Sequence, residues 1–235
     1  MKSTKNKHIC ILNCYHNYEH ILKCFESIEN LNFDFFIVEN FSENSDKIYE
    51  YFHKKNLIGY VQFKKNIANN AMNIIKKDFK NLFNSYEYIT FSDCDLYSEN
   101  SVELFDEIYK ILELDKVGVC CSKLSKQNLP NVPGSNRWIP NPISIEHEYI
   151  NVNSGIHFMT MKNKTYKLLE DLYFLDITLS TKIRNSGLNW VTTINNEVTH
   201  LTWDLYYSGN SYYEFKKNNN KIWSQKLDSD YKIII

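Results

Sequence analysis

The chain has 235 residues, of which 43% are hydrophobic and 23% charged, and its formal net charge is −1. This composition is ordinary for a soluble globular protein with a sizeable core, and the near-zero charge argues against generalised nucleic-acid binding. No stretch approaches eighteen uninterrupted apolar residues, so we expect no membrane span and a cytoplasmic protein. The six cysteines follow no zinc-like spacing and are expected to be reduced and mostly buried.

The first half of the chain alternates apolar strands with amphipathic helices. Strands are expected at residues 8–13, 33–38, 59–63, 88–91 and 117–122. Apolar residues at helical spacing predict helices at residues 18–30, 45–55, 67–83 and 101–114. This rhythm predicts a Rossmann-like, doubly wound α/β fold with a mostly parallel sheet. Because ligands bind beyond the carboxyl ends of such strands, we expect Asn13, Glu39 and Asp93 along one rim.

The second half of the chain is less regular. Residues 126–143 hold all four prolines, which predicts a loop long enough to be functional. Beyond it we expect strands at 151–161, 190–194 and 197–201, helices at 164–172 and 176–186, and a Tyr-rich tail. No Gly/Ser-rich linker or internal repeat separates the halves. The sequence therefore predicts one domain over 1–235, with a nucleotide-binding half (1–125) and an acceptor-side half with the tail (126–235).

The tripeptide Asp93-Cys94-Asp95 follows the aromatic and β-branched run 88–91. Two carboxylates at the mouth of a buried strand are costly unless something cationic binds there. A divalent metal that carries a diphosphate fits, because Mg²⁺ or Mn²⁺ takes one or two carboxylate oxygens and fills its octahedron with phosphate and water. The pattern Asp-x-Asp also occurs by chance, and the alternative is an acidic turn that caps the following helix.

Four segments, in order and spacing, resemble the inverting glycosyltransferases of the GT-A fold, the large family-2-like group of bacterial glycan and polysaccharide enzymes. They are the opening strand and loop, a strand end similar to hhVDNgS, the metal-binding Asp-x-Asp and a helix similar to D-x-x-L-x-x-R-h-x-x-x-G, at residues 9–17, 36–42, 91–95 and 175–187. The resemblance implies transfer of a hexose or pentose from a nucleotide sugar, expected to be a UDP-sugar, to a hydroxyl acceptor. Glycans, lipid-linked sugars, proteins and modified nucleobases all qualify as acceptors.

The resemblance also gives the matched residues roles. Asp95 is implied as a metal ligand, Asp93 as a contact of ribose or metal, and His200 as a third ligand, with Mn²⁺ or Mg²⁺ bound. Asp176 is implied as the general base on the acceptor side. Glu39 stands where the family has Asp and is expected to meet the base or ribose. For His200 the alternative is a half-buried side chain with no role in metal binding. For Asp176 it is an aspartate favoured by the helix dipole, and for Glu39 a solvated loop carboxylate.

Four further side chains are expected around the nucleotide. Tyr15 is placed to stack on the base and Lys64 to meet phosphate, while Asn13 and Asn66 line the same pocket. For all four the alternative is ordinary surface.

The loop 126–143 suits a lid that orders over a bound ligand, with Arg137 and Trp138 at its tip. The alternative is a plain connection. Some aromatic side chains are expected to stack on a sugar ring, and Trp203 is the first candidate. The full set of candidates is Trp138, Trp190, Trp203, Tyr206 and Tyr207.

Two other functional classes compete. A phosphatase of the haloacid-dehalogenase type also carries Asp-x-Asp after a strand, but on its first strand and with Thr or Val where this chain has Tyr97. A non-catalytic sugar-nucleotide or carbohydrate-binding module on a transferase scaffold is disfavoured, since a dead site has no reason to keep the carboxylates and His200 together. The sequence leaves the acceptor and the oligomeric state open.

Overall fold

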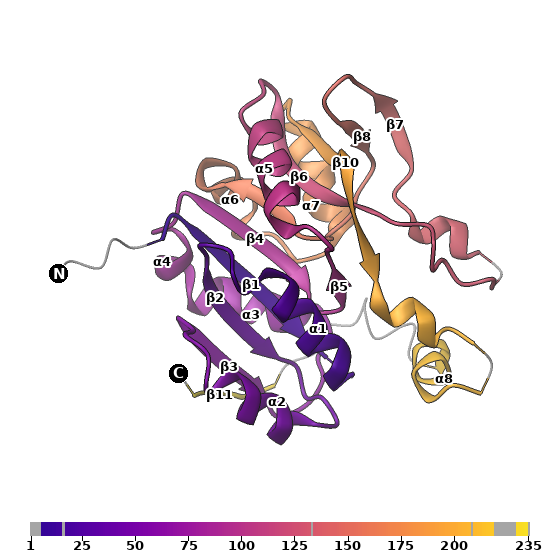
Figure 1. Cartoon of the computed structure of the whole chain (residues 1–235). Helices are drawn as coiled ribbons and strands as arrows, with labels where there is room; N and C mark the ends of the chain where they lie inside the picture. The colour runs from indigo at the N-terminus through magenta and orange to yellow at the C-terminus, as the bar shows by residue number, and fades with distance from the viewer. Residues whose placement is uncertain (1–5, 16, 133, 208, 219–228, 235) are drawn as a thin grey trace.

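The computed structural model describes residues 6–15, 17–132, 134–207, 209–218 and 229–234. Its first half alternates strands and helices as the sequence predicts (Figure 1). The strands of this half are β1 His8–Cys14, β2 Asp34–Glu39, β3 Gly59–Phe63, β4 Tyr88–Asp93, β5 Leu96–Tyr97 and β6 Val117–Leu124. The helices are α1 Tyr18–Ile28, α2 Ser45–Phe52, α3 Asn70–Asp78, α4 Lys80–Phe83 and α5 Ser101–Leu112.

The second half holds shorter elements. They are η1 Ser135–Trp138, β7 Pro142–Ile145, β8 Ile150–Val152, β9 Met159–Lys162, α6 Asn163–Leu169, α7 Asp176–Asn185, β10 Asn189–His200, η2 Leu201–Leu205, α8 Ser211–Asn218 and β11 Tyr231–Ile233. Three expectations need correction. The strand expected at 151–161 is two strands with a loop between them, the strands expected at 190–194 and 197–201 are the single strand β10, and the helix expected at 67–83 breaks at Phe79.

All the strands belong to one connected arrangement. The order is β11-β3-β2-β1-β4-β9-β6-β10-β8-β7, and β5 pairs with the end of β10. The long strands β1, β2, β3, β4, β6 and β10 run in one direction, which confirms the predicted mostly parallel α/β sheet. β9 was not expected in its position: it lies antiparallel between β4 and β6, at the centre of the sheet.

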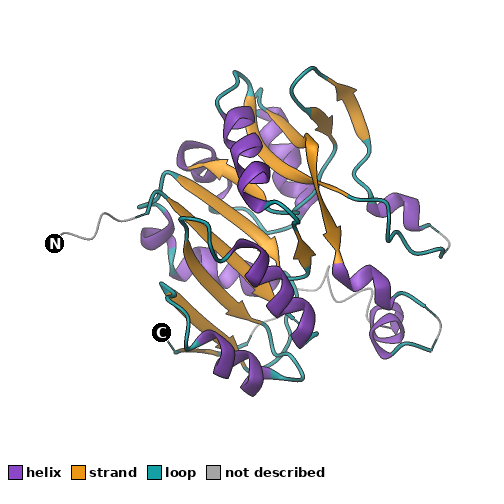
Figure 2. Ribbon diagram, in the orientation of Figure 1, coloured by secondary structure: helices purple, strands orange, loops and turns teal. Residues whose placement is uncertain are grey.

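Helices cover both faces of the sheet (Figure 2). Alternate residues of β1 supply the two cores: Cys10 and Leu12 pack with α1, α2 and α5, whereas Ile9 and Ile11 pack on the other face with α3, α4, α6 and α7. Each fully buried aliphatic side chain contributes roughly 1.5–3 kcal/mol. Within the described ranges, no helix is both long and apolar enough to cross a membrane.

Strand register brings the predicted rim together. Asn13 near the end of β1 is the neighbour of Val38 in β2 and of Asp93 in β4, so the carboxyl ends of these strands share one edge. The far end of β10 reaches the same edge, because His200 pairs with Leu96 of β5. Residues separated by more than half the chain therefore meet beside the Asp-x-Asp tripeptide.

Candidate functional site

A first cavity opens at the carboxyl edge of β1 and β4, and we call it the Asp-x-Asp cavity. Among its lining residues are five that the sequence assigned to donor or metal binding: Asn13, Tyr15, Asn66, Asp93 and Asp95. The Asn13 amide donates to Asp93 Oδ1 at 3.3 Å, which joins the ends of the two strands. Partial burial raises the pKa of the Tyr15 hydroxyl, so this ring is neutral near pH 7. The structure thus brings these five side chains to one cavity.

Asp95 and His200 lie side by side in this region. His200 Nδ1 is 3.6 Å from Asp95 Oδ2, and the Thr202 hydroxyl donates to the same oxygen at 2.7 Å. The backbone reinforces the pairing, because the Leu201 N–H donates to the Asp95 carbonyl at 2.7 Å. Trp203 stacks on the His200 ring with 4.9 Å between centroids and an interplanar angle of 5°. The imidazole is therefore held in a fixed orientation beside the carboxylate.

The loops that follow β2 and β3 both line the Asp-x-Asp cavity, and Asn40 joins them through hydrogen bonds. Its amide donates to the Ala68 carbonyl at 3.0 Å, and its Oδ1 accepts from the Ile67 N–H at 3.1 Å. Phe41 (φ 61°) and Ala68 (φ 49°) both adopt left-handed backbone conformations that are costly for residues other than glycine. Such strain persists where surrounding contacts enforce it, and here the Asn40 bonds do so.

Glu39 does not face the cavity. Its side chain is fully buried, and its carboxylate accepts from the Ser42 N–H at 2.6 Å and the Ser45 hydroxyl at 3.0 Å. Burial raises the pKa of this carboxyl despite these bonds. Glu39 thus shapes the loop after β2 and Asn40 lines the cavity, so this geometry gives no support to direct contact of Glu39 with a base or ribose.

Lys64 also lies apart from the predicted pocket. Its ammonium group forms an exposed ion pair with Asp230 at 2.9 Å and lines a different depression, beside Lys65. Its neighbour Asn66 turns inward, where its side chain accepts from the Ala68 N–H at 2.8 Å. The phosphate contact predicted for Lys64 is not supported by this placement.

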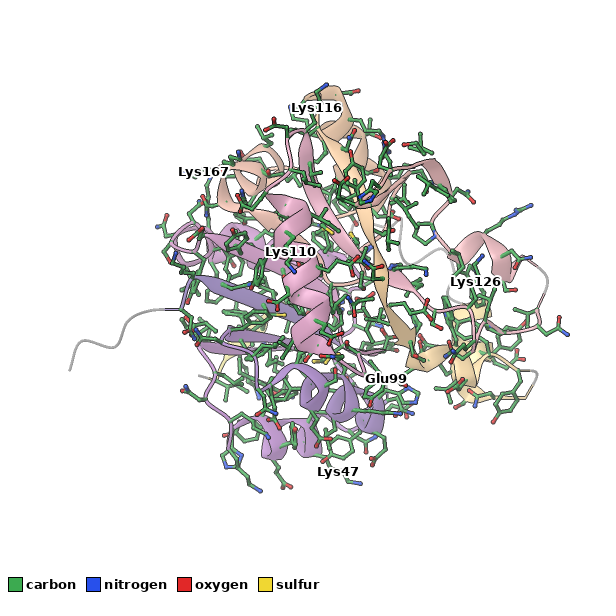
Figure 3. All side chains as sticks on the ribbon, turned by 45° about the horizontal axis from the view of Figure 1, so that its top comes forward. Lys47, Glu99, Lys110, Lys116, Lys126 and Lys167 are labelled. Atoms are coloured by element: carbon green, nitrogen blue, oxygen red, sulfur yellow. The ribbon has the colours of Figure 1, made fainter. Side chains whose placement is uncertain are left out.

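A second cavity of about 240 Å³ lies on the acceptor side, and we call it the Asp176 cavity. Its lining includes Asp176, His157 and Asn153 together with Arg137 and Trp138. Arg137 and Trp138 at the tip of the loop 126–143 therefore line the same cavity as Asp176, the predicted general base. Lys126, the first residue of this loop, is labelled in Figure 3. Asp176 is the first residue of α7, and its Oδ1 accepts from the N–H of the next residue at 2.7 Å.

The segment before Asp176 is braced from α3. The Tyr173 hydroxyl donates to Asn70 Oδ1 at 3.2 Å, and the Phe174 N–H donates to Asn73 Oδ1 at 2.6 Å. These asparagines are one helical turn apart and so lie on the same face of α3. The helix that starts beside the Asp-x-Asp cavity thus also sets the position of Asp176.

Lys76, one turn further along α3, completes this brace. Its buried ammonium group donates to the carbonyls of Leu169 and Leu172 at 2.9 and 2.8 Å. Burial lowers the pKa of Lys76 to about 8, against the opposing effect of Asp171 and Glu170. The lysine thus ties α3 to the last residue of α6 and to the turn that follows it.

His157 lies between the Asp176 cavity and His200, and it was not among the residues predicted from the sequence. Its half-buried ring lines the Asp176 cavity and makes an edge-to-face contact with His200, 6.3 Å between centroids. Burial, followed by the neighbouring His200, lowers the pKa of His157 to about 3, so the ring is neutral at pH 7. From the sequence, His157 is a single histidine before an apolar strand, and this pattern does not predict that its ring lines a cavity.

The aromatic candidates separate clearly. Trp190 is fully buried in the core and cannot stack on a sugar, which corrects that expectation. Trp203 is only 4% exposed and lies against His200, so it positions the histidine and is not the first stacking surface. Trp138 is half-buried, lines the Asp176 cavity and packs on Tyr206 with 4.7 Å between centroids. Tyr207 is 57% exposed.

Within the part of the chain that the structure describes, no group of three His, Cys, Asp or Glu side chains is arranged to hold a metal ion. The arrangement present is the pair Asp95 and His200, with Asp93 nearby on the same cavity wall. A carboxylate and an imidazole are donors that suit Mn²⁺, and a diphosphate with water supplies the remaining ligands in such sites. The residues are therefore compatible with a metal that binds together with a diphosphate.

Comparison with known proteins places the chain by fold. No protein-family profile matches it. A curated relative, "Uncharacterized protein L142" of Acanthamoeba polyphaga mimivirus, is 28% identical over 96% of this chain. The chain spans half or less of the length of the curated relatives it matches.

Two solved structures define the fold class. The mannosyltransferase PcManGT from Pyrobaculum calidifontis, in complex with GDP-Man and Mn²⁺, aligns with a TM-score of 0.60 at 12% identity over 92% of this chain and 61% of that one. TarS of S. aureus, in complex with UDP-GlcNAc, aligns with a TM-score of 0.58 at 17% identity over 83% and 60%. The chain has the GT-A-type α/β fold of nucleotide-sugar transferases.

Proposed function

We propose that this chain is a glycosyltransferase that moves a sugar from a nucleotide sugar to a hydroxyl acceptor. The observation that carries the proposal is the pairing of His200 with Asp95, which lines the Asp-x-Asp cavity, while Asp176 lines a second cavity together with His157, whose ring contacts His200. Transfer needs a group that neutralises the departing diphosphate and a base on the opposite side of the sugar. The GT-A-type fold supports a donor of the nucleotide-sugar class.

Asp95 and His200 would hold Mn²⁺ or Mg²⁺, with Asp93 beside them. A bound divalent ion would neutralise charge on the diphosphate leaving group. The protein itself fixes the two side chains: Thr202 binds the Asp95 carboxylate, and Trp203 stacks on the imidazole. In the nucleotide part of the cavity, Tyr15 offers a ring for base stacking, and Asn13 and Asn66 offer amides.

Asp176 is the proposed general base. Its carboxylate would take the proton of the acceptor hydroxyl as the oxygen attacks the anomeric carbon, on the side opposite the diphosphate, so the reaction would invert the configuration. The rigid support of the preceding segment by Asn73 and Lys76 favours a fixed carboxylate. UDP as the nucleotide, and a glycan, lipid-linked sugar, protein or modified nucleobase as acceptor, complete the proposal, with kinship to the family-2-like transferases.

The competing classes fit less well. The Asp-x-Asp tripeptide follows β4, the fourth strand in the chain, whereas a haloacid-dehalogenase-type phosphatase carries it after the first strand. A non-catalytic binding module would bind a nucleotide sugar without a need for Asp176. Hydrolysis of p-nitrophenyl phosphate with Mg²⁺ would indicate a phosphatase. Transfer of sugar from a nucleotide sugar would distinguish a transferase from a non-catalytic binding module.

A thermal-shift screen tests the proposal. UDP-, GDP-, CMP- and dTDP-sugars are added with and without Mn²⁺, to the wild type and to Asp95→Asn. A true donor at a hundredfold excess over its Kd stabilises by roughly 2.7 kcal/mol. We expect stabilisation by one nucleotide class, dependent on Mn²⁺ and lost in Asp95→Asn. If no nucleotide sugar stabilises the wild type in either condition, the proposed function is wrong.

A further inference from the structure

The backbone that carries His157 is fixed from two directions. Ser122 in β6 donates to the His157 carbonyl through both its N–H, at 2.7 Å, and its hydroxyl, at 3.0 Å. Arg184 in α7 donates to the carbonyls of Val152 and Asn153 at 3.1 and 2.5 Å. The loop between β8 and β9 is therefore pinned to the sheet and to the helix that begins at Asp176.

The same loop contains two residues with left-handed backbones on either side of His157. Gly155 has φ 145°, a conformation that side chains rarely adopt, and Phe158 has φ 44° although its ring is fully buried. The Phe158 N–H is held by the Ser92 hydroxyl at 3.2 Å, one residue before the Asp-x-Asp tripeptide. Strain of this kind, enforced by neighbouring contacts, is concentrated where a protein positions a group for function.

The His157 imidazole has no hydrogen bond to another described side chain or backbone group. Its Nδ1 is buried and unpartnered among the described residues, which leaves Nε2 as the nitrogen for a ligand. The ring lines the Asp176 cavity on one side and contacts His200 on the other. Nε2, which is not among the buried atoms, is thus a polar atom on a firmly anchored residue at a cavity wall, where a ligand can reach it.

We infer that His157 Nε2 hydrogen-bonds a hydroxyl group of the transferred sugar. The inference rests on the proposed function and deepens it. A donor with its diphosphate beside Asp95 and its anomeric carbon within reach of the acceptor oxygen that Asp176 activates must place its sugar ring between these two carboxylates. His157 lies on that path, because it touches both His200 and the Asp176 cavity.

The inference makes His157 a selector of the sugar and not of the nucleotide. An imidazole nitrogen can hydrogen-bond a hydroxyl group, which both donates and accepts. Because no other part of the donor passes this point, removal of the ring affects ligands that carry a sugar and spares free nucleoside diphosphates. A residue that only supported the fold would affect both kinds of ligand alike.

Calorimetry on the whole chain with Mn²⁺ tests this. UDP-glucose, UDP-N-acetylglucosamine and GDP-mannose are titrated into wild type, His157→Ala and His157→Asn, each beside free UDP or GDP. The matched control is His147→Ala, whose side chain is 95% exposed. We expect His157→Ala to weaken nucleotide-sugar binding about tenfold, the usual worth of one hydrogen bond, and to change UDP or GDP binding less than twofold. His157→Asn, which replaces the imidazole with an amide that can still hydrogen-bond, is expected to restore part of the loss, and the control to change neither.

The outcomes separate the two proposals. Equal weakening of sugar-bearing and sugar-free ligands, or unchanged affinity for both, overturns the role of His157 while the proposed function stands. Absence of any nucleotide-sugar binding by the wild type overturns both. Melting temperatures of all variants accompany the titrations, and if His157→Ala does not fold, His157→Asn and His157→Gln carry the same comparison.

Discussion

The two cavities are built in different ways. The Asp-x-Asp cavity stands on the ends of neighbouring strands, where the register of β1 and β4 places Asn13 against Asp93. The Asp176 cavity is assembled from a proline-containing loop, the loop between β8 and β9, and the first residue of a helix. Strand ends hold side chains in fixed positions, whereas loops vary more in sequence and length among related proteins. On the proposed function, selectivity for sugar and acceptor is expected to depend on the Asp176 cavity.

The largest effect is expected where the strand-built cavity loses its charge. Asp95→Asn keeps an acceptor for the Thr202 hydroxyl but removes the negative charge, so we expect transfer to fall by about a thousandfold or more. Initial rates with Mn²⁺ measure this. Asp204→Asn, an exposed aspartate four residues after His200, is the control. Full turnover in excess EDTA would contradict a metal role for this cavity.

Asp176→Asn probes the loop-built cavity in the same way. We expect kcat to fall by roughly 10² to 10⁴, the range for loss of a general base, with donor affinity almost unchanged. Asp171→Asn, an exposed aspartate in the preceding segment, is the matched control. If Asp176→Asn lost donor binding and kept its rate, Asp176 would belong to the nucleotide site and the contrast between the cavities would fail.

Lys76→Met tests whether α3 couples the two cavities. The substitution removes the ammonium donor of the Leu169 and Leu172 carbonyls, so we expect the free energy of unfolding to fall by about 1–3 kcal/mol at pH 7. It should lower kcat more than it weakens nucleotide binding, because the brace supports the segment before Asp176. Equal effects on kcat and nucleotide affinity would argue for general destabilisation.

The pH dependence of this variant has a definite sign. The pKa of Lys76 is lowered from 10.5 in its ordinary state to about 8 when folded, so between these pH values the unfolded chain binds more protons. The stability of the wild type should therefore rise with pH across this window, relative to Lys76→Met. Urea unfolding of both proteins at pH 7, 8, 9 and 10 measures the difference. A difference that stays constant with pH would mean that Lys76 does not titrate there.

The smallest effect concerns the loop 126–143. Lys126 and Arg137 are exposed, and Trp138 at the tip lines the Asp176 cavity. If the loop orders over a bound donor, cleavage by trypsin at these residues should slow several-fold when nucleotide sugar and Mn²⁺ are added together. Cleavage at Lys47, on α2 at the far side of the protein (Figure 3), is the internal control. An unchanged rate at Arg137 would mean that the loop is only a connection.

The parts predicted correctly from the sequence are those specified by local pattern. Apolar runs of four to six residues that end in polar side chains gave β1, β2 and β4, and the parallel arrangement then fixed the rim that holds Asn13, Asp93 and Asp95. His200 was assigned by resemblance. Its meeting with Asp95 depends on β5, a strand of only two residues that no periodicity can reveal.

The missed parts depend on contacts distant in sequence. Lys64 turns away from the cavity toward Asp230, a partner 166 residues later in the chain. Glu39 looks like a rim carboxylate from its place at a strand end, yet the turn after β2 folds back and buries it. His157 owes its position to Ser122, Ser92 and Arg184, none of which is its neighbour in sequence.

The place of β9 in the sheet has a consequence for how the chain folds. β6 pairs with β9 and β10, both of which follow residue 125, and only β9 joins it to β4. A nascent chain that ends near residue 125 would present β4 and β6 as open edges, with no partner between them. Pairing across such sequence distances is slow and comes late in folding. We therefore expect the two halves to unfold in a single cooperative transition, and a fragment of residues 1–125 to aggregate instead of folding as a nucleotide-binding unit.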